Sequence, residues 1–372
     1  MPPSPDPLNL QFLHKWSQVE ADCRELEARG HCSAFQTIAW LRPFYGQLAP
    51  ALGLEPLFLR VSHRDASQPL MLWPLVRDRR LGLSMLSFAD AGISDYNAPL
   101  VVREGLPPAT WSRALQALRR QGHVLRLDKL QTHLGGPPSP LLAAMGAAAA
   151  ELSFGSWAVN LPRTFEDYER LALSPAFTKD LAMRWRRLQR KGNVRFELAR
   201  TPDARRRAFE ALVRQRARRF AETGRDDILG RAEFRRCYEM AAVEEPGETV
   251  RLFTLAVDET VVAVMLAIDH EGTRHMVMPS FEAGEWKNCS PGNLLISMSI
   301  RDAIEAGLSR YDFTIGDETY KAGFGATRQP MHGGLLPLSF TGACAVHGVR
   351  LARALRQRLA RSRPAPSPQP TA

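Results

Sequence analysis

The chain has 372 residues, of which 45% are hydrophobic and 24% charged, a composition typical of a globular protein with a sizeable core. This length leaves room for two domains of roughly 100–200 residues each. No apolar run approaches the roughly 18 residues of a membrane-spanning helix, and the N-terminal stretch does not read as a secretory signal, so we expect a cytoplasmic protein.

The cysteines and histidines exclude two further classes. The five cysteines are Cys23, Cys32, Cys237, Cys289 and Cys344, and none form a Cys-x-x-Cys pair, which predicts reduced thiols rather than a disulfide scaffold or a zinc site. The nine histidines show no metal-ligand spacing, so no metal is expected. His275 lies within a strand pattern and is predicted to be a core residue. Cys289 has no nearby histidine in sequence, which favours a structural or cofactor-adjacent thiol over a nucleophile.

The formal net charge is +10, and most of the excess lies between Arg184 and Arg219. One interpretation is a solvated helix face, with Leu181, Trp185 and Leu188 turned inward at helical spacing. The other is a docking surface for an anionic ligand, such as a phosphorylated cofactor, an RNA or a charged polysaccharide intermediate. No nucleic-acid-binding motif is present, so we do not expect a nucleic acid as the partner.

The first half begins with helical periodicity and continues with strand-like runs. Helices are expected over 13–30 and 34–52, a hairpin over 56–80, two short strands around a polar loop over 83–102, a helix over 109–121 and a strand over 123–130.

The second half repeats this order of helices followed by a hairpin. Thr164 is a plausible cap before an acidic first turn, and basic helices lead to Gly247. A hairpin over 250–269 and a strand over 273–281 follow. Ser290 is predicted to cap a helix with Pro291 in its first turn, and Gly307 to end it.

The chain closes with a strand over 310–315, a basic helix and a Pro-rich tail. The helix could lie on an anionic membrane surface, although Leu351, Leu355 and Leu359 make only a narrow stripe. The residues from Pro364 onward are expected to be disordered.

The two hairpins resemble each other. "LFLRV" followed by "LMLWPLV" parallels "LFTLAV" followed by "VVAVMLAI", about 190 residues later. We therefore predict an α/β fold with two duplicated modules, each a mixed sheet flanked by helices. The predicted boundaries are 1–160, 161–345 and a tail over 346–372.

The loop 289–293 precedes the predicted helix and offers free backbone N–H groups. Ser290, Gly292 and Asn293 are candidate ligands of a phosphate or pyrophosphate, and Lys287 adds charge upstream. Taken alone, this loop is more often an ordinary capped helix.

The stretch "YDFTIGDETYKAGFGA", residues 311–326, resembles the signature of the CelD-like family of GNAT-type acetyltransferases. "SPGNLLISMSIRDAIEAG", "SDYNAPLV" and "RRLQRKGNVRFE" support this resemblance. It implies tandem GNAT-like modules related in fold to Fem-type aminoacyl transferases, with a degenerate N-terminal module. It also implies acetyl-CoA or another acyl-CoA as co-substrate and a link to cellulose or exopolysaccharide biosynthesis. Ala322 and Gly323 depart from the family's bulkier residues.

The resemblance implies roles for the loop residues. Asp317 or Glu318 would act as the base, Tyr320 would protonate the leaving thiolate, and Lys321 would hold a cofactor phosphate. Without the resemblance, a salt-bridged turn is the simpler interpretation.

A second group contains candidates for contacting the acceptor. Asp312 would orient the loop from within its strand. Asp95 and Tyr96 would reach the acceptor if the halves pack together, although a plain turn is the alternative.

The function expected from these observations is an acyl-CoA-dependent N- or O-acyltransferase that acts on a cell-envelope sugar or polysaccharide precursor. Two alternatives stay open. One is a transferase that uses aminoacyl-tRNA, and the other is a non-catalytic scaffold subunit of an exopolysaccharide pathway.

Overall fold

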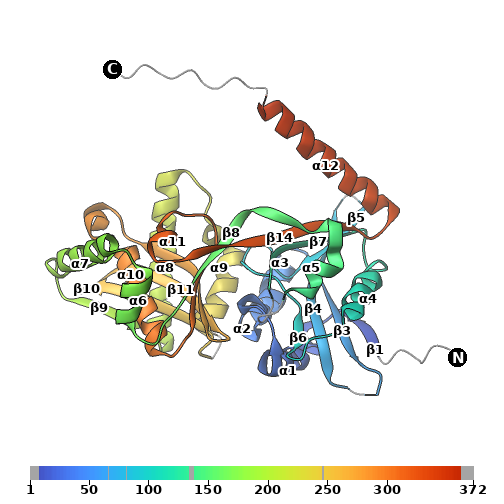
Figure 1. The fold of residues 1–372 in the computed structure, drawn as a ribbon, viewed down its shortest axis with the longest axis horizontal. Helices are drawn as coiled ribbons and strands as arrows, with labels where there is room; N and C mark the ends of the chain where they lie inside the picture. The colour runs from blue at the N-terminus through green and yellow to red at the C-terminus, as the bar shows by residue number, and fades with distance from the viewer. Residues whose placement is uncertain (1–7, 66, 81, 134–137, 245–246, 362–372) are drawn as a thin grey trace.

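The computed structural model describes residues 8–65, 67–80, 82–133, 138–244 and 247–361. The predicted Pro-rich tail from residue 364 lies outside these residues. Among them, the strands form one mixed sheet of 14 strands with helices on both faces (Figure 1). This confirms the predicted α/β class.

The first half contains eight strands and five α-helices among the described residues. Its strands are β1 (Leu8–Leu13), β2 (Gly30–His31), β3 (Glu55–His63), β4 (Pro69–Arg80), β5 (Leu83–Phe88), β6 (Leu100–Val102), β7 (Val124–Gln131) and β8 (Ala150–Asn160). Its helices are α1 (Glu20–Arg29), α2 (Ile38–Pro43), α3 (Ala49–Ala51), α4 (Pro108–Leu118) and α5 (Pro140–Met145), with single 3₁₀ or π turns η1 (Trp16–Gln18), η2 (Ala34–Gln36), η3 (Phe44–Leu48) and η4 (Gly146–Ala148).

The second half contains the longer helices. Its strands are β9 (Val194–Leu198), β10 (Val250–Val257), β11 (Thr260–His270), β12 (Thr273–Phe281), β13 (Arg310–Ile315) and β14 (Thr327–Pro337). Its helices are α6 (Phe165–Ala172), α7 (Pro175–Gln189), α8 (Pro202–Thr223), α9 (Ala232–Glu239), α10 (Pro291–Glu305), α11 (Tyr320–Gly323) and α12 (Phe340–Arg361), with η5 (Ile228–Gly230), η6 (Met240–Glu244) and η7 (Gly284–Cys289).

The strand order is symmetric about its centre. It runs β1-β3-β4-β5-β7-β14-β8-β13-β12-β11-β10-β9. β1, β3, β4, β5 and β7 on one side thus correspond to β9, β10, β11, β12 and β13 on the other. The predicted duplication is therefore visible in the topology, although the two halves share little sequence.

The two central strands are exchanged between the halves. β8, which follows β7 along the chain, pairs with β13, and β14, which follows β13, pairs with β7. β8 and β14 also pair with each other and join the halves at the middle of the sheet (Figure 1). The boundary predicted at residue 160 falls at the end of β8, a strand that the second half's sheet requires.

Each half contains one parallel strand pair joined by a crossover that includes a helix, α4 or α10. β5 pairs with β7 only over Met85–Ser87 and Val124–Arg126. β12 pairs with β13 only over Thr273–His275 and Arg310–Asp312. Beyond these residues the strands of each pair diverge.

The strand leaving each parallel pair carries the same irregularity. β7 has a bulge opposite Gly333 of β14, and β13 has one opposite Trp157 of β8. A non-glycine residue with positive φ lies in each bulge, Lys129 at +59° and Thr314 at +57°. L-residues rarely adopt this conformation, so its recurrence at matching positions is further support for duplication.

The halves share a hydrophobic core. β10 and β11 are apolar along nearly their whole length because helices cover both faces of the sheet. One core cluster spans α2 and α9, where the rings of Trp40 and Tyr238 meet edge to face at 5.5 Å. The second half's own core lies on the opposite face, under α7 and α10. The halves are therefore held together by packing as well as by strand exchange.

Candidate active site

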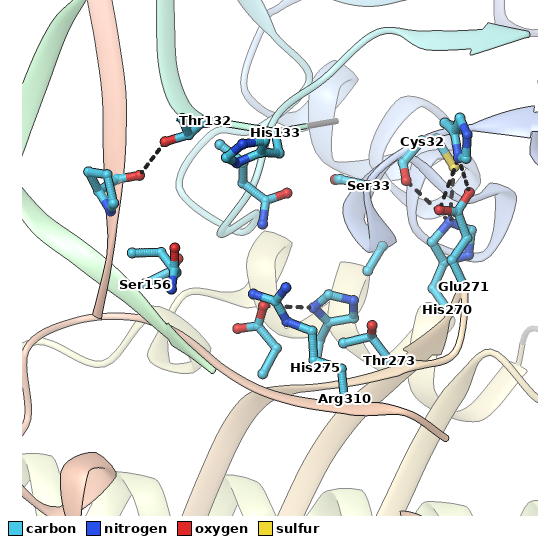
Figure 2. Close-up of a pocket in the computed structure, with 16 residues that line it drawn as sticks. Cys32, Ser33, Thr132, His133, Ser156, His270, Glu271, Thr273, His275 and Arg310 are labelled. Atoms are coloured by element: carbon cyan, nitrogen blue, oxygen red, sulfur yellow. Dashed lines mark hydrogen bonds and ion pairs between the residues drawn. The ribbon is translucent and has the colours of Figure 1, made fainter. Parts of the chain in front are cut away.

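A cavity of about 560 Å³ lies between the two halves. Figure 2 shows its walls, which come from the segment before η2, the end of β7, the β11–β12 turn and the first residues of β13, with β8 and β14 along one side. No single half forms this cavity, because each contributes only part of the wall.

His275 and Asp312 lie in the wall at the last paired position of the β12–β13 ladder. His275 is 9% exposed, and its Nδ1 lies 3.8 Å from Asp312 Oδ2. This nitrogen has no hydrogen-bond partner among the described residues. Burial lowers the pKa of His275 to about 4, and the Asp312 carboxylate opposes this effect. His275 is therefore neutral at neutral pH, and its Nδ1 is a buried nitrogen that faces the Asp312 carboxylate.

Asp312 is held in place from the other side. The Tyr96 hydroxyl donates to Asp312 Oδ1 at 2.6 Å, and the backbone N–H of Thr314 donates to the same oxygen at 2.7 Å. Burial and the neighbouring Asp312 raise the pKa of Tyr96 well above its usual value, so its hydroxyl keeps its proton. The structure thus brings together two of the predicted acceptor-binding residues, although 216 positions separate them in sequence. Their binding role remains a prediction.

Asp95 precedes Tyr96 and lies near Thr314, outside the residues that line the cavity. Burial raises the pKa of Asp95 to about 6, while the Lys129 ammonium acts in the opposite direction. Asp95 therefore faces the bulge of β13 rather than the cavity.

Asp317 is a half-exposed ion-pairing residue. Its Oδ1 accepts hydrogen bonds from Trp157 Nε1 at 3.0 Å and from Arg328 Nε at 3.2 Å. The Trp157 hydrogen bond is the largest cause of a lowered pKa, and the Gly155 backbone N–H and Arg328 add to it. Asp317 is not among the residues that line the cavity. Its predicted catalytic role remains a prediction.

Lys321 is only 2% exposed, and its ammonium is occupied within the loop. It donates to the carbonyls of Ile315 and Gly316, both at 2.9 Å, and pairs with Glu318 at 2.9 Å. Tyr320 is mostly buried, and burial raises the pKa of its phenol. The charged residues in this loop therefore fasten the end of β13 to α11. Their predicted roles as base, acid and phosphate ligand remain predictions.

The N-terminus of α10 differs from the sequence-based expectation at Ser290. Its side chain does not cap the helix, because Ser290 has a left-handed backbone with φ of 45°. Its hydroxyl instead accepts a hydrogen bond from Arg184 of α7. The prediction of a serine cap was wrong, whereas Pro291 does occupy the first turn.

The other predicted phosphate ligands surround this helix end. A Cβ at Gly292 would lie 2.7 Å from the Phe281 ring, so only glycine fits there. The Asn293 N–H donates to the Ser290 carbonyl at 3.0 Å, and Lys287 is exposed. Cys289, buried at 1% exposure, belongs to the core under α10.

The basic segment 184–219 reaches the same region from two helices. Arg187 of α7 donates to the Asn288 carbonyl at 3.4 Å. Arg219 of α8 lies over the Phe281 ring at 5.0 Å, at the end of β12. Part of this segment therefore flanks the α10 N-terminus rather than facing only solvent.

Sequence reasoning missed His275 as a functional candidate and did not single out Arg310. His275 was expected in the core, and it is buried, but its ring faces a polar cavity. The signal in the sequence was Asp312, a carboxylate within an apolar strand. Its pairing with His275 is seen only in the structure.

Comparison with known proteins agrees with this architecture. The family described as the acetyltransferase (GNAT) domain matches residues 176–322, most of the second half. No curated protein matches the chain.

Solved structures resemble nearly the whole chain. A structure of FemX has a TM-score of 0.59 at 11% identity and covers 87% of this chain and 96% of its own. The structure of L-PGS from Bacillus licheniformis has a TM-score of 0.54 at 12% identity and covers 94% of this chain and 99% of its own. The C-terminal domain of a putative lysylphosphatidylglycerol synthetase from Agrobacterium fabrum has a TM-score of 0.53 at 12% identity. It covers 91% of this chain and 96% of its own. At these identities the likeness shows the fold.

Described helices include none that is both long and apolar enough to cross a bilayer. The same residues contain no group of three or more His, Cys, Asp or Glu side chains that could hold a metal.

Proposed function

We propose that this protein is a GNAT-type acyltransferase that moves an acyl group from an acyl-CoA, such as acetyl-CoA, to an amine or hydroxyl acceptor in the central cavity. One observation carries the proposal. His275 and Asp312 lie both in the cavity wall and at the point where β12 and β13 stop pairing. A donor between the diverging strands and an acceptor in the cavity would meet at this pair.

The N-terminus of α10 would receive the phosphates of the donor. Helix N-termini favour anions because the helix dipole is positive there. At this end the Asn293 N–H already donates to the Ser290 carbonyl. Arg184 and Arg187 bring guanidinium groups to this end, and Arg219 lies nearby over Phe281. These residues give a structural basis for the anionic-ligand interpretation of the basic segment.

His275 would act as the general base. A neutral imidazole takes the proton of the attacking amine or hydroxyl as the bond to the thioester carbon forms. The Asp312 carboxylate stabilises the imidazolium, and Tyr96 and the Thr314 N–H keep that carboxylate in position. The tetrahedral intermediate then collapses and releases the CoA thiolate.

The oxyanion of that intermediate requires a hydrogen-bond donor. Val277 is the extra residue of a bulge in β12, where Met276 and Met278 pair with consecutive residues of β11. The backbone groups of a bulged residue stay outside the ladder. We assign the Val277 N–H as the oxyanion donor.

The acceptor we propose is a cell-envelope sugar or polysaccharide precursor, on the resemblance of residues 311–326 to the CelD-like family. The polar lining of the cavity, which includes Gln131, Thr132 and Gln329, is compatible with hydroxyl-rich ligands. Binding of an aminoacyl-tRNA donor is the second candidate, favoured by the arginines of α7 and α8. A donor held through many phosphates would lose affinity steeply as salt rises.

The first test is the thermal midpoint with and without acetyl-CoA. A ligand that binds only the native state stabilises it by about 2.7 kcal/mol at a hundred-fold excess over Kd. Arg184→Gln should weaken the binding of acetyl-CoA by ~10–100-fold, because it removes a charge-assisted hydrogen bond. Arg195→Gln, at a half-exposed arginine of β9, is the matched control and should bind as the wild type does.

Two results would reject the proposed donor. One is no stabilisation by any acyl-CoA, and the other is an equal loss in both arginine variants. Steeply salt-dependent binding of aminoacyl-tRNA would then support the second candidate. Full biological activity of His275→Gln would support the scaffold interpretation instead.

A further inference from the structure

Two arginines at the start of adjacent strands have opposite environments. Arg274 of β12 has a 2% exposed side chain and is saturated by carboxylates, with Asp269 at 2.8 Å and Asp302 at 2.7 Å. Arg310, the first residue of β13, lines the central cavity. Its Nε is buried without a hydrogen-bond partner, and no carboxylate of the described residues forms an ion pair with it. Arg274 holds the fold together, whereas Arg310 has an unused guanidinium.

The carboxylates of the cavity wall are engaged elsewhere. Glu271 lies 3.3 Å from His31 Nδ1 and 3.7 Å from His270 Nε2. Asp312 accepts from Tyr96 and the Thr314 N–H. Among the described wall residues, the Arg310 guanidinium is therefore the fixed charge that lacks a counter-ion. Figure 2 shows it beside His275, at the floor of the cavity.

We propose that Arg310 anchors an acidic group of the acceptor, a carboxylate or a phosphate, next to the reaction centre. A guanidinium matches both groups because its planar fork donates two parallel hydrogen bonds. That this anion belongs to the acceptor rests on the acyltransferase function proposed above. The anion subsite itself rests on the environment of Arg310.

The spacing along β13 limits the shape of this acceptor. Arg310 and Asp312 are two residues apart on one strand, so their side chains point to the same face and their Cα atoms lie about 6.5 Å apart. The acidic group would therefore lie about one sugar ring or one amino-acid unit from the nucleophile.

An anion on Arg310 would also act on the base. The positive charge of Arg310 is one of the causes of the lowered pKa of His275. A bound anion offsets that charge and raises the proton affinity of His275. An acidic acceptor would then be a better substrate than its neutral analogue in turnover as well as in binding.

The first experiment measures anion binding directly, without donor or turnover. The thermal midpoint is followed against inorganic phosphate and, separately, against acetate, at constant ionic strength set with chloride. Four proteins are compared, namely the wild type, Arg310→Gln, Arg184→Gln and the double variant. Arg184 lies at the proposed site of the donor phosphates, so Arg184→Gln weakens anion binding there. The response that remains in this variant reports anion binding in the cavity.

We expect Arg184→Gln to keep a rise in midpoint with phosphate, acetate or both, and the double variant to lose it. A rise in phosphate alone indicates a phosphorylated acceptor, and a rise in acetate indicates a carboxylate. Equal responses of Arg184→Gln and the double variant would overturn the subsite. If Arg310→Gln does not fold, crystals of the wild type soaked in phosphate replace it. Density on Arg310 then supports the subsite, and its absence there overturns it.

A second arm separates the subsite from the reaction. Transfer from acetyl-CoA is measured to paired amines that differ in one acidic group, an amino acid and its amide or glucosamine 6-phosphate and glucosamine. The wild type should prefer the acidic member at least ten-fold, and Arg310→Gln should lose this preference. Transfer without preference would reject the subsite and keep the acyltransferase. Arg310-dependent anion binding without transfer to any acceptor would keep the subsite and count against the acyltransferase.

Discussion

The two halves of the sheet have the same plan but differ where their parallel strands diverge. In the first half, the gap beyond the β5–β7 ladder is occupied by the half's own loop. The Lys129 ammonium donates to the Ser94 carbonyl at 2.6 Å and pairs with Asp90 at 3.0 Å, and the Asn97 N–H donates to the Lys129 carbonyl at 3.0 Å. In the second half, Thr314 takes the place of Lys129, and its hydroxyl donates to the Met276 carbonyl at 3.1 Å.

Matching positions in the two ladders carry different chemistry. Counted from the bulge residues Lys129 and Thr314, Leu127 and Leu125 of the first half correspond to Asp312 and Arg310 of the second. The parallel ladders end at Ser87 in β5 and at His275 in β12. Duplication thus explains the backbone, bulge included, whereas the groups suited to proton transfer and anion binding lie in one half. The degenerate N-terminal module stays a prediction.

The largest effect should come from removing the proposed base. His275→Gln should lower turnover by ~10²–10⁴-fold, the usual contribution of general base catalysis, with little change in acetyl-CoA affinity. Ser87→Ala, at the last paired residue of the first half's parallel ladder, should leave turnover unchanged. Steady-state kinetics of both variants checks this. An equal loss of turnover in both would contradict the proposal that only the second half carries the base.

His275 should also make the free energy of unfolding depend on pH. Its folded pKa of about 4 lies below the ordinary value of 6.5, so the unfolded chain binds more protons between these values. Stability should fall as pH drops from 6.5 through 4, by about 3 kcal/mol from this group.

Denaturant unfolding of the wild type and His275→Gln across this range measures the difference. Asp95, whose pKa is raised to about 6, has the opposite sign but is common to both proteins and cancels. Parallel pH profiles for the two proteins would contradict the assignment.

A smaller effect is expected from two lysines, the buried Lys321 and the partly buried Lys129. Lys321→Met should destabilise the protein by about 2 kcal/mol, because the carbonyls of Ile315 and Gly316 lose a charged donor. Lys129→Met should cost a similar amount in the first half. Thermal unfolding and acetyl-CoA titration of both variants test this. A selective loss of acetyl-CoA affinity in Lys321→Met would restore the cofactor-binding role predicted from sequence.

The smallest effect should belong to Asp317→Asn. Its ion pair with Arg328 is half exposed and screened by solvent, so its loss should change stability little. Turnover should change only a few-fold. If it fell as far as in His275→Gln, Asp317 would be the base, as the sequence suggested, and the cavity pair would be secondary.

The sequence by itself determined the α/β class, the repeated hairpins, the first turn of α10 and strand β13. These features depend on local periodicity, proline and glycine. Pro291 and the alternation over 310–315 needed no tertiary information. Ser290 shows the limit of such reasoning. Its cap was predicted from residue type, but Arg184, 106 positions away, binds its hydroxyl.

Only the tertiary structure decided where the reactive groups meet. Tyr96, His275 and Asp312 come from both halves, and nothing local links them. The exchange of β8 and β14 brings the halves together and creates the cavity between them. Whether a charged residue is saturated, as Arg274 is, or left free, as Arg310 is, depends on partners that the fold supplies. For that reason the sequence could locate the loop at 312–321. It could not show that the Lys321 ammonium bonds the carbonyls at the end of β13.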